Sequence, residues 1–379
     1  MKLESIALEN FRNYSKIEVN INSDLVLILG ANASGKTNFL ESIYFLSRLK
    51  SFRSPDQFLV KIGENYFKLA ANVIARPDLI RPKQSHGEIA ASSRQGGTPR
   101  DDQEKDLEVI VQVTPILKRS FKLNGQKIKR GLWQSFAAVL FIPTDLNLFS
   151  LGPLLRRRYL DDTLSQVSKN YAFDLVSLDH VLGQRKALLE KIALQQAQRE
   201  ELSFWNEQLI TLTLSIGQER KCFLDFLNER LNSVYSQLSG FKNKFAVEYK
   251  TDAQGDLHKL IKEHEGAEVR SGQNLIGPHR EDFVLNKDGL LNVYNSSRGE
   301  LRSQILAIKF LQAEYLNSHD FKPIIFLDDV FSELDEERRI KLLENLSGHQ
   351  IFITTTEEHH LPEIKQAQKL KVENGQFLP

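Results

Sequence analysis

The sequence predicts an α/β protein in which both ends of the chain build one lobe and a mostly helical lobe is inserted between them. An apolar, strand-like run at 25–29 leads into a glycine-rich loop and a helix-like stretch. Short apolar runs of the same kind return at 324–327 and 351–353. Between them, residues 156–240 lack proline and are rich in helix-forming residues.

Composition restricts the classes of function. The chain has 379 residues, 41% hydrophobic and 26% charged, which suits a folded protein of two or three domains, or one large domain carrying an insertion. The 50 Lys and Arg residues are balanced by 49 Asp and Glu residues, so any nucleic-acid binding must come from a local patch. The single cysteine, Cys222, excludes an intramolecular disulfide and fits a reducing compartment. With no run of 18 apolar residues and a charged N-terminus, we expect a soluble cytoplasmic protein that has no membrane partner.

The N-terminal part predicts strands followed by a helix. Ile17, Val19 and Ile21 alternate with polar residues, as in a half-buried strand, and residues 2–21 are read as strands. Apolar spacings of three and four predict a helix over 36–49. Residues 76–106 are rich in Pro, Gly, Ser and charge, and we interpret them as a surface loop joining two strands of one sheet, 69–74 and 107–113.

The middle of the chain predicts a helical hairpin or bundle. Leucine-rich faces recur between residues 175 and 238, and one helix from Ser203 to Leu238 would be about 50 Å long at 1.5 Å per residue. We expect three divisions: an N-terminal part of the first lobe at 1–155, a helical arm lobe at 156–272, and a C-terminal part of the first lobe at 273–379.

A glycine-rich loop carries the clearest functional signal. It matches G-x-x-x-x-G-K-[ST] and lies between a predicted strand and a predicted helix. Such a loop curls its backbone N–H groups around phosphate oxygens, at the positive end of the following helix. Lys36 would neutralise the β- and γ-phosphates of ATP, and the Thr37 hydroxyl would bind Mg²⁺. The alternative is a plain turn before an ordinary helix. The residues of the loop are Gly30, Ala31, Asn32, Ala33, Ser34, Gly35, Lys36 and Thr37.

A second apolar strand ends in two carboxylates, Asp328 and Asp329. Asp328 would hold Mg²⁺, directly or through water, and Asp329 would act as general base for the attacking water. The alternative is a helix-capping turn. The following Ser332 to Asp335 can be a helix cap, a loop that crosses to a second protomer, or both.

A serine and a glycine begin another predicted helix, Leu301 to Leu316, about 30 residues before the acidic strand. This order resembles that of ABC-type ATPases, in which an LSGGQ-like signature of one subunit caps the γ-phosphate bound to the other. Ser297 and Gly299 occupy the serine and second-glycine positions of this signature. Arg298 stands for the first glycine and Glu300 for the glutamine. The predicted fold class is therefore a P-loop, ABC-type ATPase lobe with an inserted helical lobe.

Further motifs resemble the RecF family of bacterial recombination-mediator ATPases, related to the structural-maintenance-of-chromosomes (SMC) proteins. The resemblance covers nearly the whole length. Its motifs are Asn10 to Tyr14, Ile142 to Leu146, Arg156 to Asp161, the distinctive Gly277 to Asp282, and Ile351 to Thr356. In the last of these motifs, threonine occupies the position at which transporter ATPases carry a switch histidine.

The resemblance implies an ATP-dependent homodimer that binds DNA at gapped or stalled replication sites. It would act with RecO and RecR to place RecA on single strands, and so support recombinational repair, replication restart and the SOS response. Arg12 would reach the nucleotide of its own protomer; alternatively it is a surface arginine in a hairpin turn. Short helical arms would distinguish the chain from its chromosome-organising relatives.

Other residues have two interpretations each. One basic cluster, formed by Arg156, Arg157 and Arg158, either lies on a solvated face or contacts DNA. The same two interpretations apply to the basic stretch from Lys118 to Arg130, which surrounds a predicted Asn124-Gly125 turn. His279 and Arg280 contact phosphate or stabilise a junction between lobes. Thr144 and Asp145 form a sensor loop or an ordinary connection, and Cys222 is expected to be packed.

The leading hypothesis is a DNA-repair ATPase. The alternatives are a chromosome-organising, SMC-like ATPase head, which predicts long heptad repeats, and a transporter subunit, which predicts an intact LSGGQ. Asp329 is one methylene shorter than the glutamate common at its position, so hydrolysis is expected to be slow, as in a switch.

Overall fold

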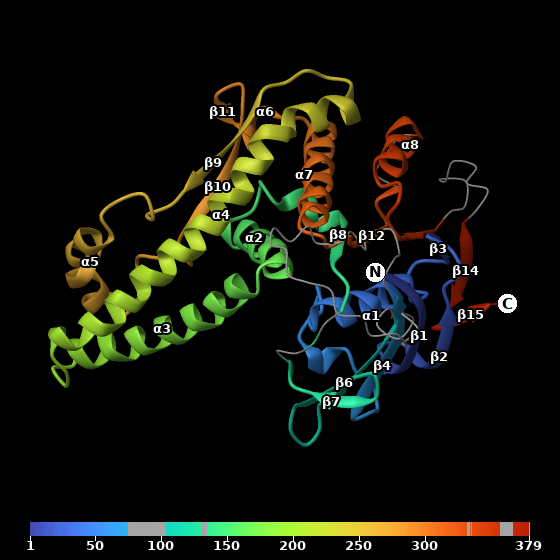
Figure 1. Cartoon of the computed structure of the whole chain (residues 1–379), viewed down its shortest axis with the longest axis horizontal. Coiled ribbons are helices and arrows are strands. Elements are labelled where there is room, and N and C mark those ends of the chain that lie inside the picture. Colours follow the sequence, from blue (N-terminus) through green and yellow to red (C-terminus); the bar gives the residue numbers. More distant parts are fainter. Residues whose placement is uncertain are drawn as a thin grey trace, which may run out of the picture. The chain divides into compact units, whose positions relative to one another are not determined.

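The computed structural model describes residues 1–74, 104–130, 133, 135–331, 334, 336–356 and 367–378. The chain divides into two compact units. Unit 1 combines Met1–Pro143 with Asp320–Pro379, and unit 2 is Thr144–His319. Both chain ends therefore build one unit, as the sequence predicted (Figure 1). Residues 273–319, which we expected to continue the ATPase lobe, are grouped with the helical arm.

A mostly parallel sheet forms one layer of unit 1. Its order is β15-β14-β3-β13-β12-β8, and only β15 runs antiparallel to its neighbour. The strands β3, β12 and β13 are apolar because both of their faces are buried. The strands are β3 (Leu25–Leu29), β8 (Ala138–Phe141), β12 (Ile324–Asp328), β13 (Ile351–Thr355), β14 (Gln368–Glu373) and β15 (Gln376–Leu378).

An antiparallel sheet of order β2-β1-β4-β5-β6-β7 forms the other layer. The strands β4 and β5 pair from Tyr66↔Gln112 to Ile74↔Glu104, so the two strands that flank the 76–106 loop lie side by side as predicted. Of that loop, residues 76–103 lie outside the described residues, and residues 104–106 belong to β5 and not to a loop. The strands are β1 (Lys2–Phe11), β2 (Tyr14–Asn20), β4 (Tyr66–Ile74), β5 (Glu104–Gln112), β6 (Lys118–Leu123) and β7 (Gln126–Ile128).

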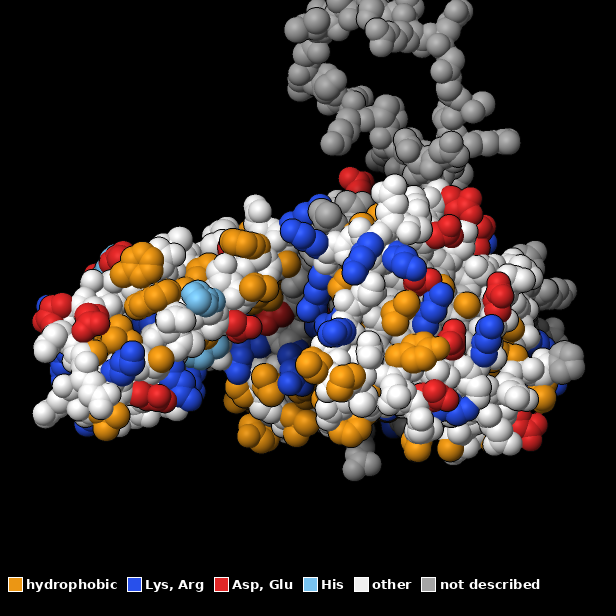
Figure 2. Space-filling model, turned by 90° about the horizontal axis from the view of Figure 1, so that it is seen from below, with side chains coloured by type: hydrophobic (Ala, Val, Ile, Leu, Met, Phe, Trp, Pro, Cys, Tyr) orange, Lys and Arg blue, Asp and Glu red, His pale blue; other side chains and the backbone are white. Residues whose placement is uncertain are grey.

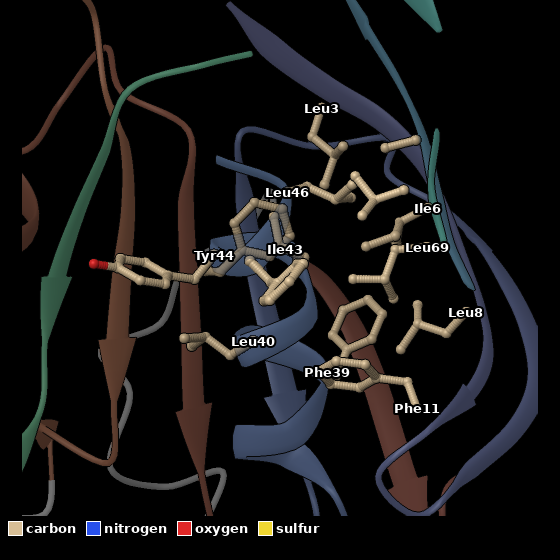
Figure 3. Close-up of a cluster of buried hydrophobic side chains, with 14 of the residues drawn as sticks. Leu3, Ile6, Leu8, Phe11, Phe39, Leu40, Ile43, Tyr44, Leu46 and Leu69 are labelled. Carbon is tan, nitrogen blue, oxygen red and sulfur yellow. The ribbon is translucent and has the colours of Figure 1, made fainter. Parts of the chain in front are cut away.

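The main core of unit 1 lies where helix α1 (Lys36–Arg48) packs between these sheets. Figure 3 shows Phe39, Ile43 and Leu46 of α1 against the inward side chains of β1 and β4. Those side chains alternate along their strands because successive residues of a strand point to opposite faces. Helix α1 is consequently fixed on several sides, and so is the loop that leads into it. Helix α8 (Glu336–Asn345) completes the unit.

Unit 2 is built around a long helical hairpin. Helices α3 (Lys169–Ala193) and α4 (Leu202–Ser239) pack against each other, and α4 also packs against α7 (Arg298–Ser318). The helix predicted from Ser203 to Leu238 is thus confirmed within one residue at each end. A three-stranded sheet, β11-β10-β9, lies beside α4. The remaining elements are α2 (Pro153–Val167), β9 (Phe245–Lys250), α5 (Leu257–Ser271), β10 (Asp282–Lys287), β11 (Leu290–Leu291) and α6 (Asn292–Asn295).

Buried ion pairs hold the base of the hairpin. Arg220 is 1% exposed and bonds Asp161, Glu281 and the Pro278 carbonyl. Further along, the equally buried Arg185 bonds Glu268. Buried charges are tolerated only when fully paired, so these contacts fix α4 against α2 and the Gly277–Asp282 motif, and α3 against α5.

Cys222 was predicted to be packed, and this is wrong. It is exposed on α4, where its Sγ accepts a hydrogen bond from Gln218 Nε2 at 3.4 Å. The buried positions nearby are Arg220, Phe223 and Leu224, so Cys222 faces the other side of the helix.

Candidate nucleotide-binding site

The predicted phosphate loop connects the end of β3 to the start of α1. Its glycines have no room for a side chain: a Cβ on Gly30 would lie 2.4 Å from the Val372 carbonyl oxygen, and one on Gly35 2.7 Å from Asn13 Nδ2. Gly35 also has a φ of 122°, which disfavours other residues. This tight curvature is what a cradle of backbone N–H groups for phosphate requires.

Segments near both ends of the chain form hydrogen bonds to this loop. From the β1–β2 turn, Asn13 Nδ2 donates to the Ser34 carbonyl at 3.0 Å, and Tyr14 donates to the Gly35 carbonyl at 2.9 Å. From the β14–β15 turn, the Gly375 N–H donates to the same Ser34 carbonyl at 2.9 Å. The loop is therefore preorganised by segments more than 350 residues apart in sequence.

Lys36 reaches back over the loop. Its Nζ donates to the carbonyls of Gly30 at 2.8 Å and Ala31 at 2.9 Å. Burial lowers the pKa of Lys36, while the nearby Asp329 and Asp328 oppose this shift. A positive charge held over a curved loop of N–H groups is suited to a polyphosphate.

Thr37 and Asp328 meet although 291 residues separate them. Thr37 Oγ1 donates to Asp328 Oδ1 at 2.7 Å. The parallel register explains the meeting: Asp328 pairs with Thr354, which pairs with Ile28 near the end of β3. Carboxyl ends of neighbouring parallel strands share one edge, so the loop and the acidic strand end together. A hydroxyl and a carboxylate at one point are the donor set that Mg²⁺ takes beside a nucleotide.

Thr354 orders both carboxylates. Its Oγ1 donates to Asp328 Oδ1 at 2.7 Å and accepts from the Asp329 N–H at 2.9 Å. Asp329 has a φ of 53°, a left-handed conformation that is unfavourable for a residue with a Cβ. This conformation turns the chain just after the strand, and Asp329 lines a cavity with Lys36 and Thr37.

This cavity has a volume of about 220 Å³ and includes a residue that sequence reasoning missed, Arg53. Arg53 donates to Asn38 Oδ1 at 2.7 Å and to Glu41 Oε2 at 2.6 Å. A second cavity of about 690 Å³ shares Asn38 and Arg53 in its lining and also includes Arg12. The one signal in the sequence was Glu41, the only acidic residue of α1.

Arg12 lies beside the loop but is heavily engaged by the protein. It forms a two-pronged ion pair with Glu41, at 2.9 and 3.0 Å, and also bonds Ser54 and the Phe58 carbonyl. Burial alone would raise the pKa of Glu41, but hydrogen bonds from Arg12, Arg53 and Ser51 outweigh it and lower this pKa. The Glu41 carboxylate thus ties the β1–β2 turn to α1.

The signature-like residues lie at the start of helix α7, in unit 2. Ser297 caps the helix: its Oγ accepts from the Glu300 N–H at 3.3 Å, and the Ser297 N–H donates to Glu300 Oε2 at 2.8 Å. In this capping box the serine hydroxyl keeps its own proton to donate. Gly299 has no heavy atom within 4 Å of the position of an added Cβ, so the tip is open there.

The distinctive motif around His279 is structural within unit 2. Arg280 donates to the Asn274 carbonyl at 3.0 and 2.9 Å, and His279 Nε2 lies 3.1 Å from the same oxygen. Arg156, one of three adjacent arginines, is buried and bonds both oxygens of Asp282 at 2.7 and 3.0 Å. Asp145 pairs with Lys309 of α7 at 3.1 Å.

The basic stretch around the Asn124-Gly125 turn forms the predicted hairpin, with φ of 50° and 74° at the turn. Two of its cations are paired: Lys122 with Glu108 at 2.7 Å, and Arg119 with Asp56. Figure 2 shows Lys and Arg side chains interspersed with acidic ones over unit 1. The exposed cations of this stretch are Lys118, Lys127, Lys129 and Arg130.

Some predicted features fall outside the described residues. Ser332, Glu333 and Asp335 are among them. Within the described ranges, no group of three or more His, Cys, Asp or Glu residues is arranged to hold a metal by itself. Among the helices that can be described, none is long and apolar enough to cross a membrane.

Comparisons with known proteins agree over the whole chain. The model of the family described as RecF/RecN/SMC N terminal domain matches residues 2–377. A DNA replication and repair protein RecF from Moorella thermoacetica is 33% identical over 368 residues, covering 96% of this chain and 92% of that protein. One from Thermoanaerobacter pseudethanolicus is 31% identical and covers 99% of both.

Solved structures give the same result. A structure of the recombination mediator protein RecF with ATP, from the RecFOR pathway, is 30% identical, with a TM-score of 0.86 and coverage of 100% of this chain and 97% of that one. An Smc head bound to the C-winged helix domain of ScpA has a TM-score of 0.56 at 14% identity, covering 100% and 96%, and is similar in fold alone. The phosphate loop is held by both ends of the chain, an acidic strand meets it, and the relatives match over nearly their whole length. The chain therefore belongs to the RecF family, within the wider RecF/RecN/SMC group.

Proposed function

We propose that this chain is an ATP-dependent DNA-binding protein of recombinational repair and replication restart. Its ATP-bound form is a homodimer that binds DNA, and with RecO and RecR it promotes loading of RecA at gaps and induction of the SOS response. Family membership supports this proposal, as do the names and titles of the relatives.

The observation that carries the ATPase part is the 2.7 Å contact between Thr37 Oγ1 and Asp328 Oδ1. It brings the two halves of a nucleotide site, far apart in sequence, to one point. Mg²⁺, when bound there by Thr37 and Asp328, neutralises developing charge on the phosphates. The residues fit this ion because they offer two hard oxygen ligands and leave the other positions to water and phosphate.

The chain's own residues divide the remaining work. The N–H groups of the loop from Gly30 to Gly35 and the ammonium of Lys36 bind and orient the β- and γ-phosphates. Asp329 takes a proton from the attacking water as ATP and water become ADP and phosphate. The larger cavity beside Arg12 holds the ribose and base, because it shares Asn38 and Arg53 with the phosphate cavity.

The site is completed by a second copy of the chain. The Ser297 hydroxyl and the N–H groups at Gly299 donate to the γ-phosphate bound by the partner, so hydrolysis requires dimerisation. The short side chain of Asp329 holds its carboxylate further from that phosphate than a glutamate would. Turnover is therefore slow, and ATP acts as a switch; a turnover number in the tens per second would contradict this.

The shortness of the arm favours repair over the alternative, a chromosome-organising SMC-like head. Helices α3 and α4 are joined by residues 194–201, so the hairpin closes within the chain. A 38-residue α4 spans roughly 57 Å at 1.5 Å per residue, far short of a long coiled coil.

The proposal is tested by sedimentation velocity with and without ATP and a DNA duplex. The wild type should dimerise only with ATP, and Ser297→Arg should stay monomeric because a bulky cation fills the tip. A wild type that remains monomeric with ATP contradicts the composite site. Dimerisation that survives Ser297→Arg contradicts the assignment of the signature.

A further inference from the structure

The signature of this chain carries a charge that its proposed role should not tolerate. Glu300 stands where the LSGGQ pattern has a neutral glutamine, and its carboxylate lies in the first turn of α7. The same helix tip is proposed to meet a γ-phosphate. Two anions at one helix N-terminus repel each other unless a cation is placed between or beside them.

A cation is present on the neighbouring strand. Lys287, at the end of β10, places Nζ 2.6 Å from Glu300 Oε1 and 3.1 Å from the Asn295 carbonyl. Its side chain is only 15% exposed, so this pair is better shielded from solvent than an ordinary surface pair. Asn243 Nδ2 also donates to Glu300 Oε1, at 3.1 Å.

Besides its one contact with Lys287 through the Asn295 carbonyl, the loop before the tip has hydrogen bonds of its own. Asn292, Ser296 and Gln304 form a closed ring of hydrogen bonds at 2.6, 3.1 and 2.6 Å, and Asn292 and Gln304 are buried. Removing the Lys287 ammonium therefore leaves the shape of the loop supported. What it removes is the charge that balances Glu300.

We infer that Lys287 is a positioning residue that neutralises Glu300, and that this pair allows an acidic signature to accept the γ-phosphate of a second copy. The inference rests on the proposed function, because it assumes that the tip of α7 meets a partner's nucleotide. The pKa of Glu300 agrees, since Lys287 is the first cause that lowers it, to about 2, and the carboxylate is charged at neutral pH.

The test is a double-mutant cycle on the dimer dissociation constant, measured by sedimentation velocity with a slowly hydrolysed ATP analogue. Lys287→Met should weaken the dimer on the order of tenfold, because it leaves an unbalanced carboxylate several ångströms from phosphate. Glu300→Gln alone should change it little, since the amide oxygen can still accept from the Ser297 N–H. The double variant should return to near the wild-type value.

Rescue by Glu300→Gln separates charge from structure. If Lys287 served only to hold Asn295, the double variant would remain as weak as Lys287→Met, and the inference would be overturned. Lys250→Met is the matched control, because it removes the exposed pair with Glu248 on the adjacent strand β9 and should leave dimerisation unchanged. Thermal unfolding of each variant shows that the fold is kept.

The two proposals fail differently. A wild type that dimerises with the analogue, beside a Lys287→Met variant of equal affinity, contradicts only the charge-balancing role. A wild type that stays monomeric contradicts the composite site, and it therefore also contradicts the role of Lys287.

Discussion

Thr354 is the residue on which the order of the two carboxylates depends. It bonds Asp328 through its hydroxyl and accepts from the N–H of Asp329, so one side chain holds both the proposed metal ligand and the backbone of the proposed base. Thr354→Val keeps the shape but removes both hydrogen bonds, and it should cost about 1–3 kcal/mol of stability because buried polar groups are left unsatisfied.

The expected functional consequence is weaker binding of Mg²⁺. We expect Thr354→Val to need several-fold more Mg²⁺ for half-maximal ATPase activity, measured by phosphate release. Thr354→Ser, which keeps the hydroxyl, should behave like the wild type. Equal Mg²⁺ requirements for the Val and Ser variants would show that Thr354 does not order Asp328.

Asp329 offers a second test at this scale. Asp329→Asn keeps the size of the side chain but cannot accept a proton, so hydrolysis should fall by about 10²-fold or more while ATP-dependent dimerisation persists. Asp329→Glu extends the carboxylate and should raise turnover. Hydrolysis that is unaffected in the Asn variant would exclude Asp329 as the base.

Residue-level prediction is possible where a motif is local. Lys36 and Thr37 are adjacent, and Asp328 ends a recognisable buried strand, so the sequence alone predicts that they lie together, and Thr37 does contact Asp328. Arg53 was missed because its partners, Asn38 and Glu41, lie on a helix that precedes it, and no local pattern marks the pairing. The buried ion pair of Arg156 with Asp282 spans 126 residues and was equally invisible.

At the scale of elements, the β14–β15 turn holds the phosphate loop in place through the hydrogen bond from the Gly375 N–H to the Ser34 carbonyl. Asn374 and Gly375 have φ of 48° and 74°, and a Cβ on Gly375 would lie 2.5 Å from the Asn13 carbonyl oxygen. Gly375→Ala should therefore destabilise the protein by about 2–4 kcal/mol, the sum of backbone strain and overlap, and weaken ATP binding.

The β6–β7 turn is a matched control for this change. Asn124 and Gly125 have nearly the same φ, of 50° and 74°, but nothing lies within 4 Å of a Cβ on Gly125. Gly125→Ala should cost only about 1 kcal/mol and leave nucleotide binding intact. Urea unfolding and titration with a fluorescent ATP analogue would distinguish the two, and equal effects would argue against the clamp.

Glu41 links three elements through Arg12 and Arg53, and its effect depends on pH. Because its folded-state pKa is lowered, its contribution to stability is present above the unfolded-state pKa and is lost as pH falls through the folded-state pKa. Glu41→Gln should be less stable than the wild type by roughly 2 kcal/mol at pH 7, the size of a lost hydrogen bond between charged groups, because Arg12 and Arg53 are partly exposed.

This difference should shrink as the pH falls below about 4.3, the ordinary pKa of a glutamate, because the unfolded chain then takes up a proton that the folded wild type resists. Urea unfolding of both proteins between pH 7 and pH 3 measures it. A gap that stays constant across this range would mean that the charge of Glu41 contributes nothing.

Element prediction followed periodicity. Alternation in β1 and β2, the apolar run of β3 and the three–four spacing of α1 were enough, since each reflects burial of one face or of both. Helix α5 was not predicted, because its charged sequence has only a narrow buried stripe, including Leu257, Ile261 and Val269. Its burial depends on partners in α3 and α4.

For the whole molecule, chain order predicted that both ends share one unit, because a phosphate loop and an acidic strand must meet. It did not predict that residues 273–319 join the helical arm, since that grouping rests on the packing of α7 against α4 and α2. The signature tip thus belongs to the same unit as the arm, in every copy of the chain.

The most direct test of the composite site is hydrolysis by mixed dimers. Asp329→Asn and Ser297→Ala, which removes the hydroxyl without filling the tip, should each be nearly inactive alone. In a mixed dimer, the Ser297→Ala chain supplies an intact Asp329 and the Asp329→Asn chain supplies an intact Ser297, so one site is complete. The account predicts that mixing the two inactive proteins restores ATP hydrolysis above the sum of the parents; a mixture that shows only that sum would contradict it.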